Sequence, residues 1–399
     1  MNAYPRVVAA AALSNLGDGI RVVALPLLAA TLTRDPVLVA GLTACSFMPW
    51  VLFGLPLGAL IDRSRPEAVM VVANVGRAAL LFLLTAALLA DVRSMLLVYG
   101  VAFLLGVGEA AYDNAAQSLV PKIVGDTGLE KANSALVTAE RVGQDLIGPA
   151  AGGVLFAAAL ALPFGLNTAA LVVAVALLAG TRTAAPPPAD SGRGARAVLT
   201  DMADGMRWLL RPHPVRTLVL AGAALTFLTM TWEATLVLLA TGPMGVGEAG
   251  YGVVLAAGAV GGVAGAVITP LLVRRFDRWT LQVAALAVCA LIDLTLAVLP
   301  TPVTAAVAWG GTGGAFAVWN VLSVTLRQRL VPPGLLGRVN SAARTLSISA
   351  VPLGALTGGA IASWDLRAPA WVSGIGLTPL TAGFTLVTRA RRDAVPEPR

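Results

Sequence analysis

The chain has 399 residues, and its composition excludes a water-soluble globular protein. Hydrophobic residues make up 57% of the chain and charged residues only 12%, about half the charged share of soluble proteins, and the mean hydropathy is +0.81. The formal net charge of +7 does not indicate nucleic-acid binding, because the basic residues cluster in short loops between apolar runs. We therefore predict a multi-span membrane protein whose surroundings are the lipid bilayer.

A membrane-spanning helix needs about 20 predominantly apolar residues, and the chain divides into twelve such runs. In chain order they are 7–32, 37–61, 67–90, 95–119, 133–160, 162–181, 215–240, 248–273, 280–299, 303–326, 339–363 and 370–388. The predicted fold is an all-α membrane protein with twelve transmembrane helices in two six-helix bundles. The predicted domains are an N-terminal bundle (1–182), a cytoplasmic linker (183–214) and a C-terminal bundle with a cytoplasmic tail (215–399).

The basic residues predict the orientation of these spans. Of the 28 basic residues, only Arg34, Arg93 and Arg367 fall in loops that would face outward. Short loops rich in Arg and Lys stay on the cytoplasmic side of a membrane. We expect a multi-pass protein of the cytoplasmic (inner) membrane, with both chain termini in the cytoplasm.

The linker between the two bundles combines a flexible stretch with a helix. Pro186, Pro187 and Pro188 are typical of a flexible segment. Beyond it, apolar residues recur at helical spacing with arginines between them, at Leu199, Met202, Met206, Leu209 and Leu210. This pattern predicts an amphipathic helix that either lies on the inner membrane surface or packs beneath the helix bundle.

Short sequence matches at a near-constant offset relate the two halves. Val120-Pro121 recurs as Val331-Pro332, and Gly152-Gly153 recurs as Gly358-Gly359. Because the matches occur in the same order, we interpret them as a six-plus-six duplication. Transporters that rock two halves about a central site are built this way.

Two glycine motifs carry a resemblance to a known family. The end of the second span contains Gly54, Gly58, Asp62 and Arg63, and the fifth span reads Gly143-x4-Gly148-Pro149-x2-Gly152-Gly153. Both resemble motifs of the major facilitator superfamily, the second one being its antiporter motif. The chain looks like the twelve-helix proton antiporter branch that exports drugs, macrolides and siderophores. Further marks of this branch are Asp18 in the first span, Asp113-Asn114 in the fourth, Gly205 to Arg211 before the seventh, and Leu336 to Asn340 before the eleventh.

Gating roles follow from this resemblance. It implies that Gly58, Asp62 and Arg63 form a conformation-dependent clamp on the inward side, whereas the alternative is a solvated Asp-Arg pair worth under about 1 kcal/mol. In the fifth span, proline removes a backbone hydrogen bond and glycine allows close helix approach. We expect this bend to be a pivot or seal between two states, or else a kink that serves packing alone. Its residues are Gly143, Gly148, Pro149, Gly152 and Gly153.

Ionisable residues inside the spans predict proton coupling. The acids are Asp18, Glu109, Asp113, Glu140, Asp145, Glu233 and Asp293, and the bases are Arg21, Arg77, Arg141 and Arg344. Three acids therefore lack a cationic partner. An unpaired carboxylate at low dielectric tends to be protonated, and reversible protonation can couple transport to a proton gradient.

The individual acids lead to different expectations. Glu109 and Asp113 share one face of a helix, so their like charges should not both ionise easily; they are the favoured protonation site, with a structural hydrogen-bonding role as the alternative. Asp18 is either a proton site or the partner of Arg21. Arg141 and Asp145 are four residues apart and indicate an ion pair, with Glu140 as a possible third member. The predicted coupling set is therefore Asp18, Glu109, Asp113, Glu140, Arg141 and Asp145.

One position departs from the resemblance. A related branch of exporters carries an arginine in the fourth span, where alignment on Gly106 places Ala102 in this chain. A proton relay that needs that arginine must be built differently here or be absent.

Substrate contacts are predicted from the helices that line the central cavity in the resembling family. They are Tyr112, Asn114, Trp232, Phe316, Trp319 and Asn320. Glu233 beside Trp232 would suit a cationic substrate through charge and cation–π attraction. The alternative is that most of these side chains face neighbouring helices.

The leading functional prediction is proton-driven export of an amphipathic small molecule by a monomer, without a cofactor or metal ion. The alternatives are a proton-coupled uptake symporter for a small nutrient and a non-transporting sensor or lipid-handling protein. An enzyme is not expected, because the spans contain no histidine and the only one, His213, lies in a polar stretch. The two cysteines, Cys45 and Cys289, stand in separate apolar runs and do not indicate a disulfide framework.

Overall fold

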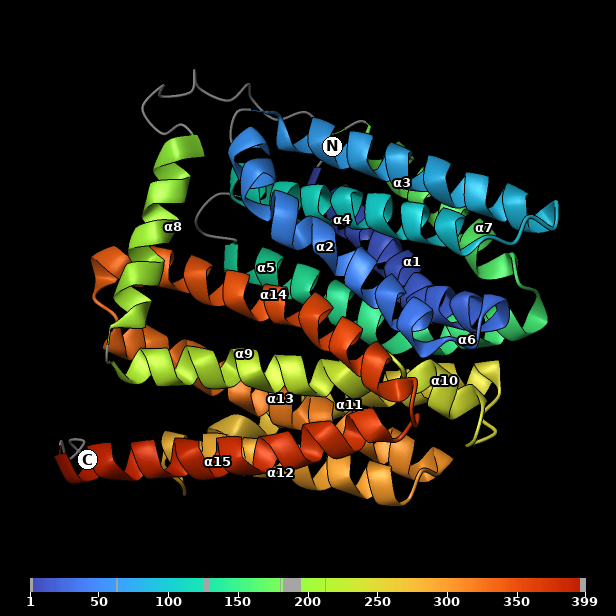
Figure 1. Ribbon diagram of the computed structural model, residues 1–399. Helices are drawn as coiled ribbons and strands as arrows, with labels where there is room; N and C mark the ends of the chain where they lie inside the picture. Colours follow the sequence, from blue (N-terminus) through green and yellow to red (C-terminus); the bar gives the residue numbers. More distant parts are fainter. Residues whose placement is uncertain are drawn as a thin grey trace. The chain divides into compact units, whose positions relative to one another are not determined.

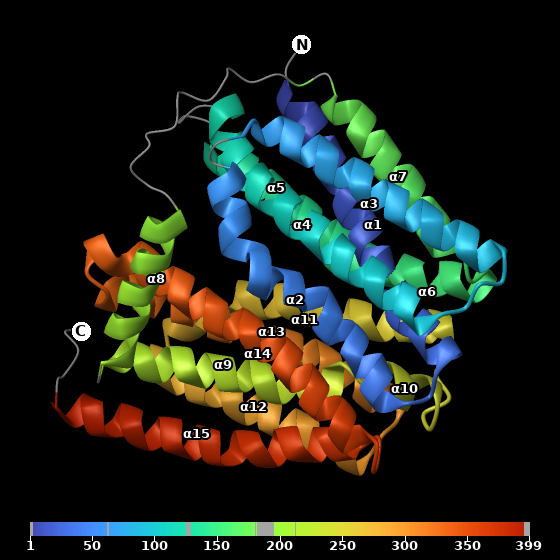
Figure 2. The same cartoon turned by 45° about the horizontal axis from the view of Figure 1, so that its top comes forward.

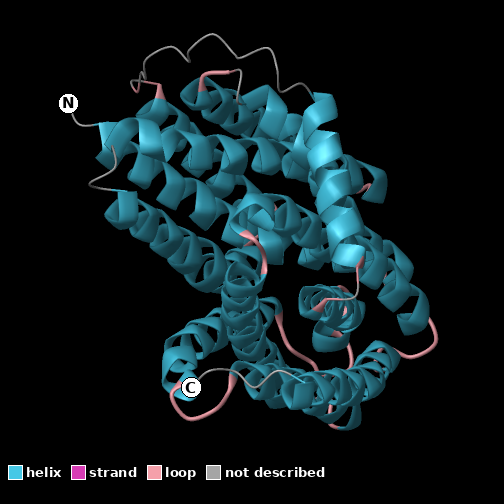
Figure 3. Cartoon of the chain, turned by 90° about the vertical axis from the view of Figure 1, so that its left-hand side faces the viewer, coloured by secondary structure: helices cyan, strands magenta, loops and turns pink. Residues whose placement is uncertain are grey.

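The computed structural model describes residues 3–61, 64–124, 129–179, 181, 195–211 and 213–394. Throughout these ranges every regular element is a helix and no strand is present (Figure 3). The all-α fold class predicted from the hydrophobic runs is confirmed.

The helices follow the predicted runs in order (Figure 1). The first half contains α1 (Ala3–Leu32), α2 (Pro36–Ile61), α3 (Pro66–Leu89), α4 (Met95–Val124), α5 (Leu129–Glu140), the π-helix η2 (Arg141–Ile147), α6 (Gly148–Ala158) and α7 (Leu162–Leu178). The linker helix is α8 (Ala195–Leu210). The second half contains α9 (Pro214–Glu233), α10 (Leu236–Thr241), α11 (Glu248–Val273), α12 (Arg278–Val298), α13 (Pro302–Leu330), the 3-10 helix η3 (Pro333–Leu335), α14 (Leu336–Ala362) and α15 (Ala368–Ala394).

In the described ranges, nine helical stretches are long and apolar enough to cross a membrane. They lie in α1, α2, α3, α4, α9 with α10, α11, α12, α14 and α15. The other three predicted spans coincide with the run α5–η2–α6, the shorter apolar helix α7, and α13. Large apolar side chains such as Leu96, Leu89 and Val72 are 80%, 77% and 71% exposed, which suits contact with lipid and not with water.

Proline and capping side chains set where several helices begin. Proline occupies the first or second position of α3, α7, α9 and α13, where its missing N–H leaves no hydrogen bond unmade. Before α12, the Asp277 side chain accepts from the backbone of Trp279 and Thr280. The Nδ1 atom of His213 accepts from Val215 N at 3.3 Å at the start of α9, so the single histidine caps a helix.

The chain divides into two compact units. Unit 1 comprises Met1–Arg34, Leu42–Thr200 and Val246–Ala256, and unit 2 comprises Asp35–Gly41, Asp201–Gly245 and Ala257–Arg399. Within unit 1, α1 packs against α6 and α7, and α3 packs against α4 and α7 (Figure 2). Within unit 2, α9 packs against α14, and α12 packs against α13 and α15.

The Gly-Gly pairs of the sequence repeat make equivalent contacts in the two units. In unit 1, a Cβ on Gly152 would lie 2.7 Å from the carbonyl oxygen of Ile20 in α1. In unit 2, a Cβ on Gly358 would collide with the carbonyl oxygen of Thr231 in α9. Each glycine therefore lets α6 or α14 approach the backbone of the first long helix of its own unit.

The part of α8 that belongs to unit 2, from Asp201 onward, packs against other helices of that unit. Its Leu209 is 1% exposed and joins an apolar cluster with Val215 of α9 and Val339 of α14. Gly205 faces the carbonyl oxygen of Arg338 so closely that a Cβ would collide with it. These contacts fix the C-terminal part of α8 on α9 and α14, and its position relative to the membrane surface stays a prediction.

Candidate proton-coupling site

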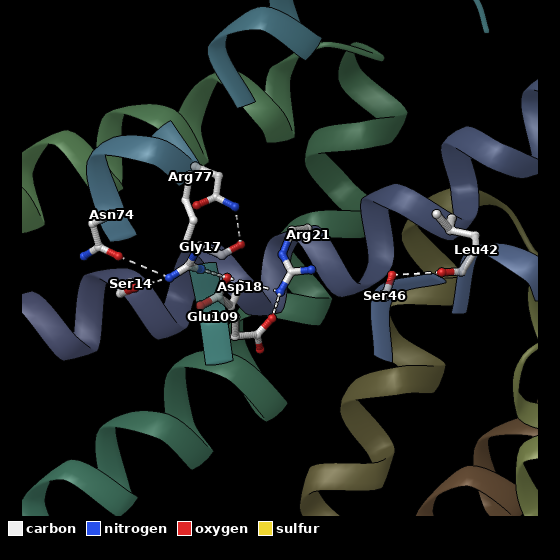
Figure 4. A network of polar contacts seen from close by, with 10 residues as sticks. Ser14, Gly17, Asp18, Arg21, Leu42, Ser46, Asn74, Arg77 and Glu109 are labelled. Carbon is white, nitrogen blue, oxygen red and sulfur yellow. Dashed lines mark hydrogen bonds and ion pairs between the residues drawn. The ribbon is translucent and has the colours of Figure 1, made fainter. Parts of the chain in front are cut away.

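Three helices of unit 1 bring charged side chains together in its interior (Figure 4). Asp18 and Arg21 lie one turn apart on α1, Arg77 comes from α3, and Glu109 comes from α4. Asp18, Arg21 and Arg77 are only 3%, 5% and 1% exposed. Charges buried this deeply are tolerated only when they are paired and hydrogen-bonded.

Hydrogen bonds join these groups into one network. Arg77 donates through Nη2 to Asp18 Oδ1, and through Nη1 to Ser14 Oγ and Asn74 Oδ1, both at 3.2 Å. Arg21 donates to Glu109 Oε2 at 2.5 Å and, over a longer 3.4 Å, to Asp18 Oδ1. Asp18 thus bridges the two guanidinium groups, and both acids have a cationic partner.

Neighbouring residues make room for the network and hold it in place. A Cβ on Gly108 would lie 2.7 Å from Cγ of Arg77, so glycine here leaves space for the arginine side chain. Asn167 of α7 donates to the carbonyl oxygen of Gly17 at 2.8 Å, beside Asp18. The Arg77 guanidinium carbon lies 6.0 Å from the ring centre of Tyr112, within the range of a cation–π interaction.

Asp113 is an acid beside the network that has no arginine partner in it. It lies one turn beyond Glu109 on α4 and is half-buried, and among the described residues it has neither an ion pair nor a hydrogen bond. Its electrostatic neighbours include Glu109, Asp18 and Arg77. Three carboxyl groups therefore face two guanidinium groups, and the pairs Asp18–Arg77 and Glu109–Arg21 use both cations.

The other predicted coupling residues lie on the α5–η2 run. Arg141 donates to Asp145 Oδ2 at 2.7 Å, and these side chains are 60% and 34% exposed. Glu140 is exposed and interacts electrostatically with both of them. In the described part of the chain, no ion pair links these three residues to the buried network.

The Gly-Pro motif of the fifth span contains a π-helix. The segment Arg141–Ile147 has π-helical hydrogen bonds, and Pro149 follows in the first turn of α6. Proline cannot donate the hydrogen bond that a regular helix needs at this point, and π segments occur where the ladder is interrupted in this way. The Gly-Pro motif is therefore accompanied by a wider helical turn.

The glycines of this motif bring the helix against α1 beside the network. A Cβ on Gly143 would lie 3.1 Å from Leu16 N, and one on Gly148 would lie 2.6 Å from Gly19 Cα. The next glycine, Gly153, faces the backbone of Gly252 at the start of α11, also in unit 1.

The predicted inward-side clamp is described only in part. Gly58 lies in α2, whereas Asp62 and Arg63 lie outside the described residues.

The predicted substrate contacts are distributed over both units and differ in burial. Tyr112, Trp232 and Trp319 are 3%, 2% and 4% exposed. Trp232 packs edge-on against Trp309 with ring centres 5.7 Å apart, and Trp319 packs against Phe384 at 5.6 Å. The side chains with accessible surface are Asn114, Glu233, Phe316 and Asn320.

Several residues of the network are not predicted as site residues from the sequence. Arg77 is predicted only as an intramembrane base, and Ser14, Asn74 and Asn167 are not among the predicted residues. A signal was present for two of them, because Asn74 and Arg77 are polar residues one turn apart in the apolar middle of α3. Such residues face the interior of a helix bundle as a rule.

Comparisons with known proteins agree with this architecture. A family model described as the Major Facilitator Superfamily matches residues 7–355. The chain is 24% identical over 394 residues to the uncharacterized MFS-type transporter YfiS of Bacillus subtilis (strain 168), an alignment that covers 96% of this chain and 90% of the relative.

Solved transporter structures resemble the chain over nearly its whole length. The nucleoside transporter NupG has a TM-score of 0.76 at 13% identity and covers 96% of this chain and 99% of its own. A bacterial homologue of the iron transporter ferroportin in an inward-facing state has a TM-score of 0.72 at 18% identity, covering 96% and 98%. A bacterial homologue of the human lysosomal transporter Spinster has a TM-score of 0.73 at 15% identity, covering 100% and 98%. At these identities the likeness concerns the fold alone.

Proposed function

The chain belongs to the Major Facilitator Superfamily of membrane transporters, and we propose that it is an exporter that exchanges protons for an amphipathic small molecule. The cargo would be a drug, an antibiotic, a siderophore or another secondary metabolite. The observation that carries the proposal is the unequal number of acids and bases in the buried network of unit 1. Two carboxylates have arginine partners there, and Asp113 has none.

Asp113 supports proton coupling because its charge is not balanced. An ionised carboxyl group one turn from Glu109 would add a negative charge to a region where both guanidinium groups are already paired. Binding one proton removes this charge without breaking either ion pair. We therefore narrow the predicted pair Glu109–Asp113 to Asp113 as the group that is protonated, with Glu109, Asp18 and Arg77 as its electrostatic surroundings.

The contacts of α1 suggest how protonation would be linked to a conformational change. The same turn of α1 that carries Asp18 packs against Gly143 and Gly148 of the fifth predicted span. A change of charge in the network would alter the forces on α1 and hence on the π-helical segment beside it. In this proposal the segment is the pivot of the rocking motion, and its antiporter motif is what favours export over uptake.

Substrate contact is proposed for the accessible candidates. Asn114 and Glu233, together with Phe316 and Asn320, offer amide, carboxylate and aromatic groups to an amphipathic cargo. Tyr112, Trp232 and Trp319 are buried within their own units, so we propose no direct cargo contact for them. An acidic group among aromatic side chains suits a cargo with a positive charge.

We further propose that the protein works as a monomer in the cytoplasmic membrane with both termini inside, in accordance with the distribution of its basic residues. A proton-coupled uptake symporter would use the same network, so the direction of coupling has to be measured. A sensor or lipid-handling protein would bind its ligand without gradient-driven flux.

The decisive experiment is transport in proteoliposomes with an imposed pH gradient. Candidate cargoes are a lipophilic cationic dye, a macrolide, a siderophore and, as a hydrophilic comparison, a nucleoside. We expect the amphipathic compounds to move against the direction of proton flow and to reverse when the gradient is reversed. Movement together with the protons would establish symport, and binding without gradient-driven flux would contradict a transport role for the network.

A further inference from the structure

Unit 2 contains a second group of carboxyls, of which Asp293 is buried and Glu233 is partly accessible. Glu233 is the last residue of α9, Asp293 lies on α12, and Ser373 lies on α15. Asp293 is five residues from the end of α12, and Ser373 is five residues from the start of α15. These are the helix ends that the distribution of basic residues predicts to face outward.

Direct contacts hold the three helices together at this point. Ser373 Oγ donates to Asp293 Oδ2 at 2.6 Å. Thr231 Oγ1 at the end of α9 donates to the carbonyl oxygen of Pro369 in α15 at 3.2 Å. A Cβ on Gly374 would lie 2.6 Å from Cγ of Leu294, so α12 and α15 are in close contact beside Asp293.

Two buried polar atoms in this group lack a hydrogen-bond partner within the described part of the chain. Asp293 is fully buried, and its Oδ1 atom accepts no hydrogen bond. Trp232 is 2% exposed, and its Nε1 donor is also unpartnered although the indole lies beside Asp293. Unsatisfied polar atoms at such depth are rare in folded proteins and indicate a functional role or a bound species.

The charges in this group all have the same sign. Asp293 is the charged group that acts on Glu233, and Cys289, one turn before Asp293 on α12, is influenced by both carboxyls. From α13 the group meets Trp309 against Trp232, and from α15 it meets the neutral Ser373. The base nearest in sequence to Ser373 is Arg367, which pairs with Asp365 at 3.3 Å.

We propose that Glu233 and Asp293 form a proton-binding site in the outer part of unit 2. One proton from the outer aqueous phase binds to a carboxylate oxygen of the pair, so that a single O–H bond forms and the site carries one negative charge. The remaining carboxylate is stabilised by the Ser373 hydroxyl. Two ionised carboxylates without a cation would be strongly disfavoured in this buried position.

This site is independent of the network proposed for unit 1. It involves different helices, and its occupancy can be measured without transport. Failure of the exporter proposal and failure of this inference are therefore distinguishable.

Infrared difference spectroscopy on the purified protein in lipid nanodiscs tests the proposal. The C=O stretch of protonated carboxyls is recorded between mildly acidic and mildly alkaline pH. We expect a wild-type band that disappears as the pH rises and that Asp293→Asn changes or removes. In Glu233→Gln the loss of the band should move to lower pH by about 1 pH unit, because a repelling charge is gone.

Ser373→Ala provides a gentler variant in case Asp293→Asn does not fold. Removing the hydroxyl donor takes away a hydrogen bond to the carboxylate, so the band should persist to higher pH. The emission of Trp232, isolated as the difference between wild type and Trp232→Phe, should change over the same pH range. Size-exclusion chromatography is the folding control for both readouts, because each folded variant should elute as a single species.

Asp365→Asn is the matched control in the same unit. The Arg367 backbone N–H and guanidinium hold the pKa of the Asp365 carboxyl below its usual range, so this exposed group stays ionised over the range tested. The variant should therefore leave the band unchanged.

Identical band titrations in wild type, Asp293→Asn and Glu233→Gln would overturn the proposal. It would also be overturned if sodium at constant pH removed the band, because the pair would then bind a metal cation in place of a proton.

Discussion

Gly148 of α6 and Gly19 of α1 meet backbone to backbone: a Cβ on Gly148 would lie 2.6 Å from Cα of Gly19 and 2.6 Å from the carbonyl oxygen of Gly143. Gly19 is the residue directly after Asp18. The antiporter-like motif therefore packs on the same turn of α1 that contributes the buried network. The motif therefore contacts the α1 backbone directly beside a member of the charged network.

Substituting Gly148 by alanine should destabilise the protein. No flexible side chain can move away from the added methyl group, so the helices must separate, at a cost of about 1–3 kcal/mol. The measurement is the melting temperature, obtained by heating samples and quantifying the remaining folded protein by size-exclusion chromatography. Gly76→Ala on α3 is the control, because nothing lies within 4 Å of its Cβ position, and it should be neutral or slightly stabilising. Equal melting temperatures for the two variants would contradict the packing argument.

Arg77→Met should be strongly destabilising. It leaves Asp18 buried with only the 3.4 Å contact to Arg21, and breaking a buried ion pair on one side costs about 3–5 kcal/mol. The double variant with Asp18→Asn should recover much of the loss, because the unpaired charge is then removed. Arg93→Met is the matched control, since its pair with Asp91 is 57% and 79% exposed and is worth under about 1 kcal/mol. A double variant no more stable than Arg77→Met would argue against a charge-based cause.

Asp113→Asn and Glu109→Gln should differ in their effects. Asp113 has no partner to lose, so its amide variant should fold as wild type but lose flux driven by a pH gradient. Glu109→Gln removes the carboxylate that Arg21 binds at 2.5 Å, and should lower stability as well as flux. The two are compared in the proteoliposome assay alongside thermal unfolding. Flux like that of wild type in Asp113→Asn would refute the assignment of the proton to this residue.

Gly205→Ala should weaken the docking of α8 on unit 2. The added methyl group would collide with the carbonyl oxygen of Arg338, whose arginine also lies 4.0 Å from Asp204. We expect faster proteolysis of the linker region and a lower melting temperature. Gly337→Ala, whose Cβ position has nothing within 4 Å, should show neither effect. Equal cleavage rates in both variants would indicate that α8 docks without this contact.

The fold was predictable to a large extent because a bilayer leaves few alternatives. Apolar runs of sufficient length must be helical, since every backbone group has to be hydrogen-bonded within its own segment. The described helices accordingly follow the predicted runs, and the repeated Gly-Gly pairs occupy equivalent packing positions. The π-helix was not foreseen, because a Gly-Pro motif predicts an interruption of the hydrogen-bond ladder but not the way in which the ladder is completed.

For the candidate site, the sequence predicted which charged residues lie in the spans but not how they pair. Asp18, Arg21 and Glu109 were predicted to be charged residues within the spans. The spacing of residues along one helix, however, did not decide whether Asp18 is a proton site or the partner of Arg21. The structure shows that Asp18 is also bound by Arg77, 59 positions away. Which acid lacks a partner depends on how three helices are rotated about their axes, and local periodicity does not contain that information.

The sequence by itself therefore determined the surroundings of the chain and its set of charged residues. It predicts a lipid-embedded helical chain with an internal repeat and with more acids than bases inside the spans. The tertiary structure alone decided how those charges pair, with Arg77 and Arg21 engaged by Asp18 and Glu109 and with Asp113 left over. The physical reason is the separation along the chain over which each interaction acts. Hydrophobic burial and backbone hydrogen bonding act through local sequence, whereas an ion pair forms between side chains that only helix packing brings within a few ångströms of each other.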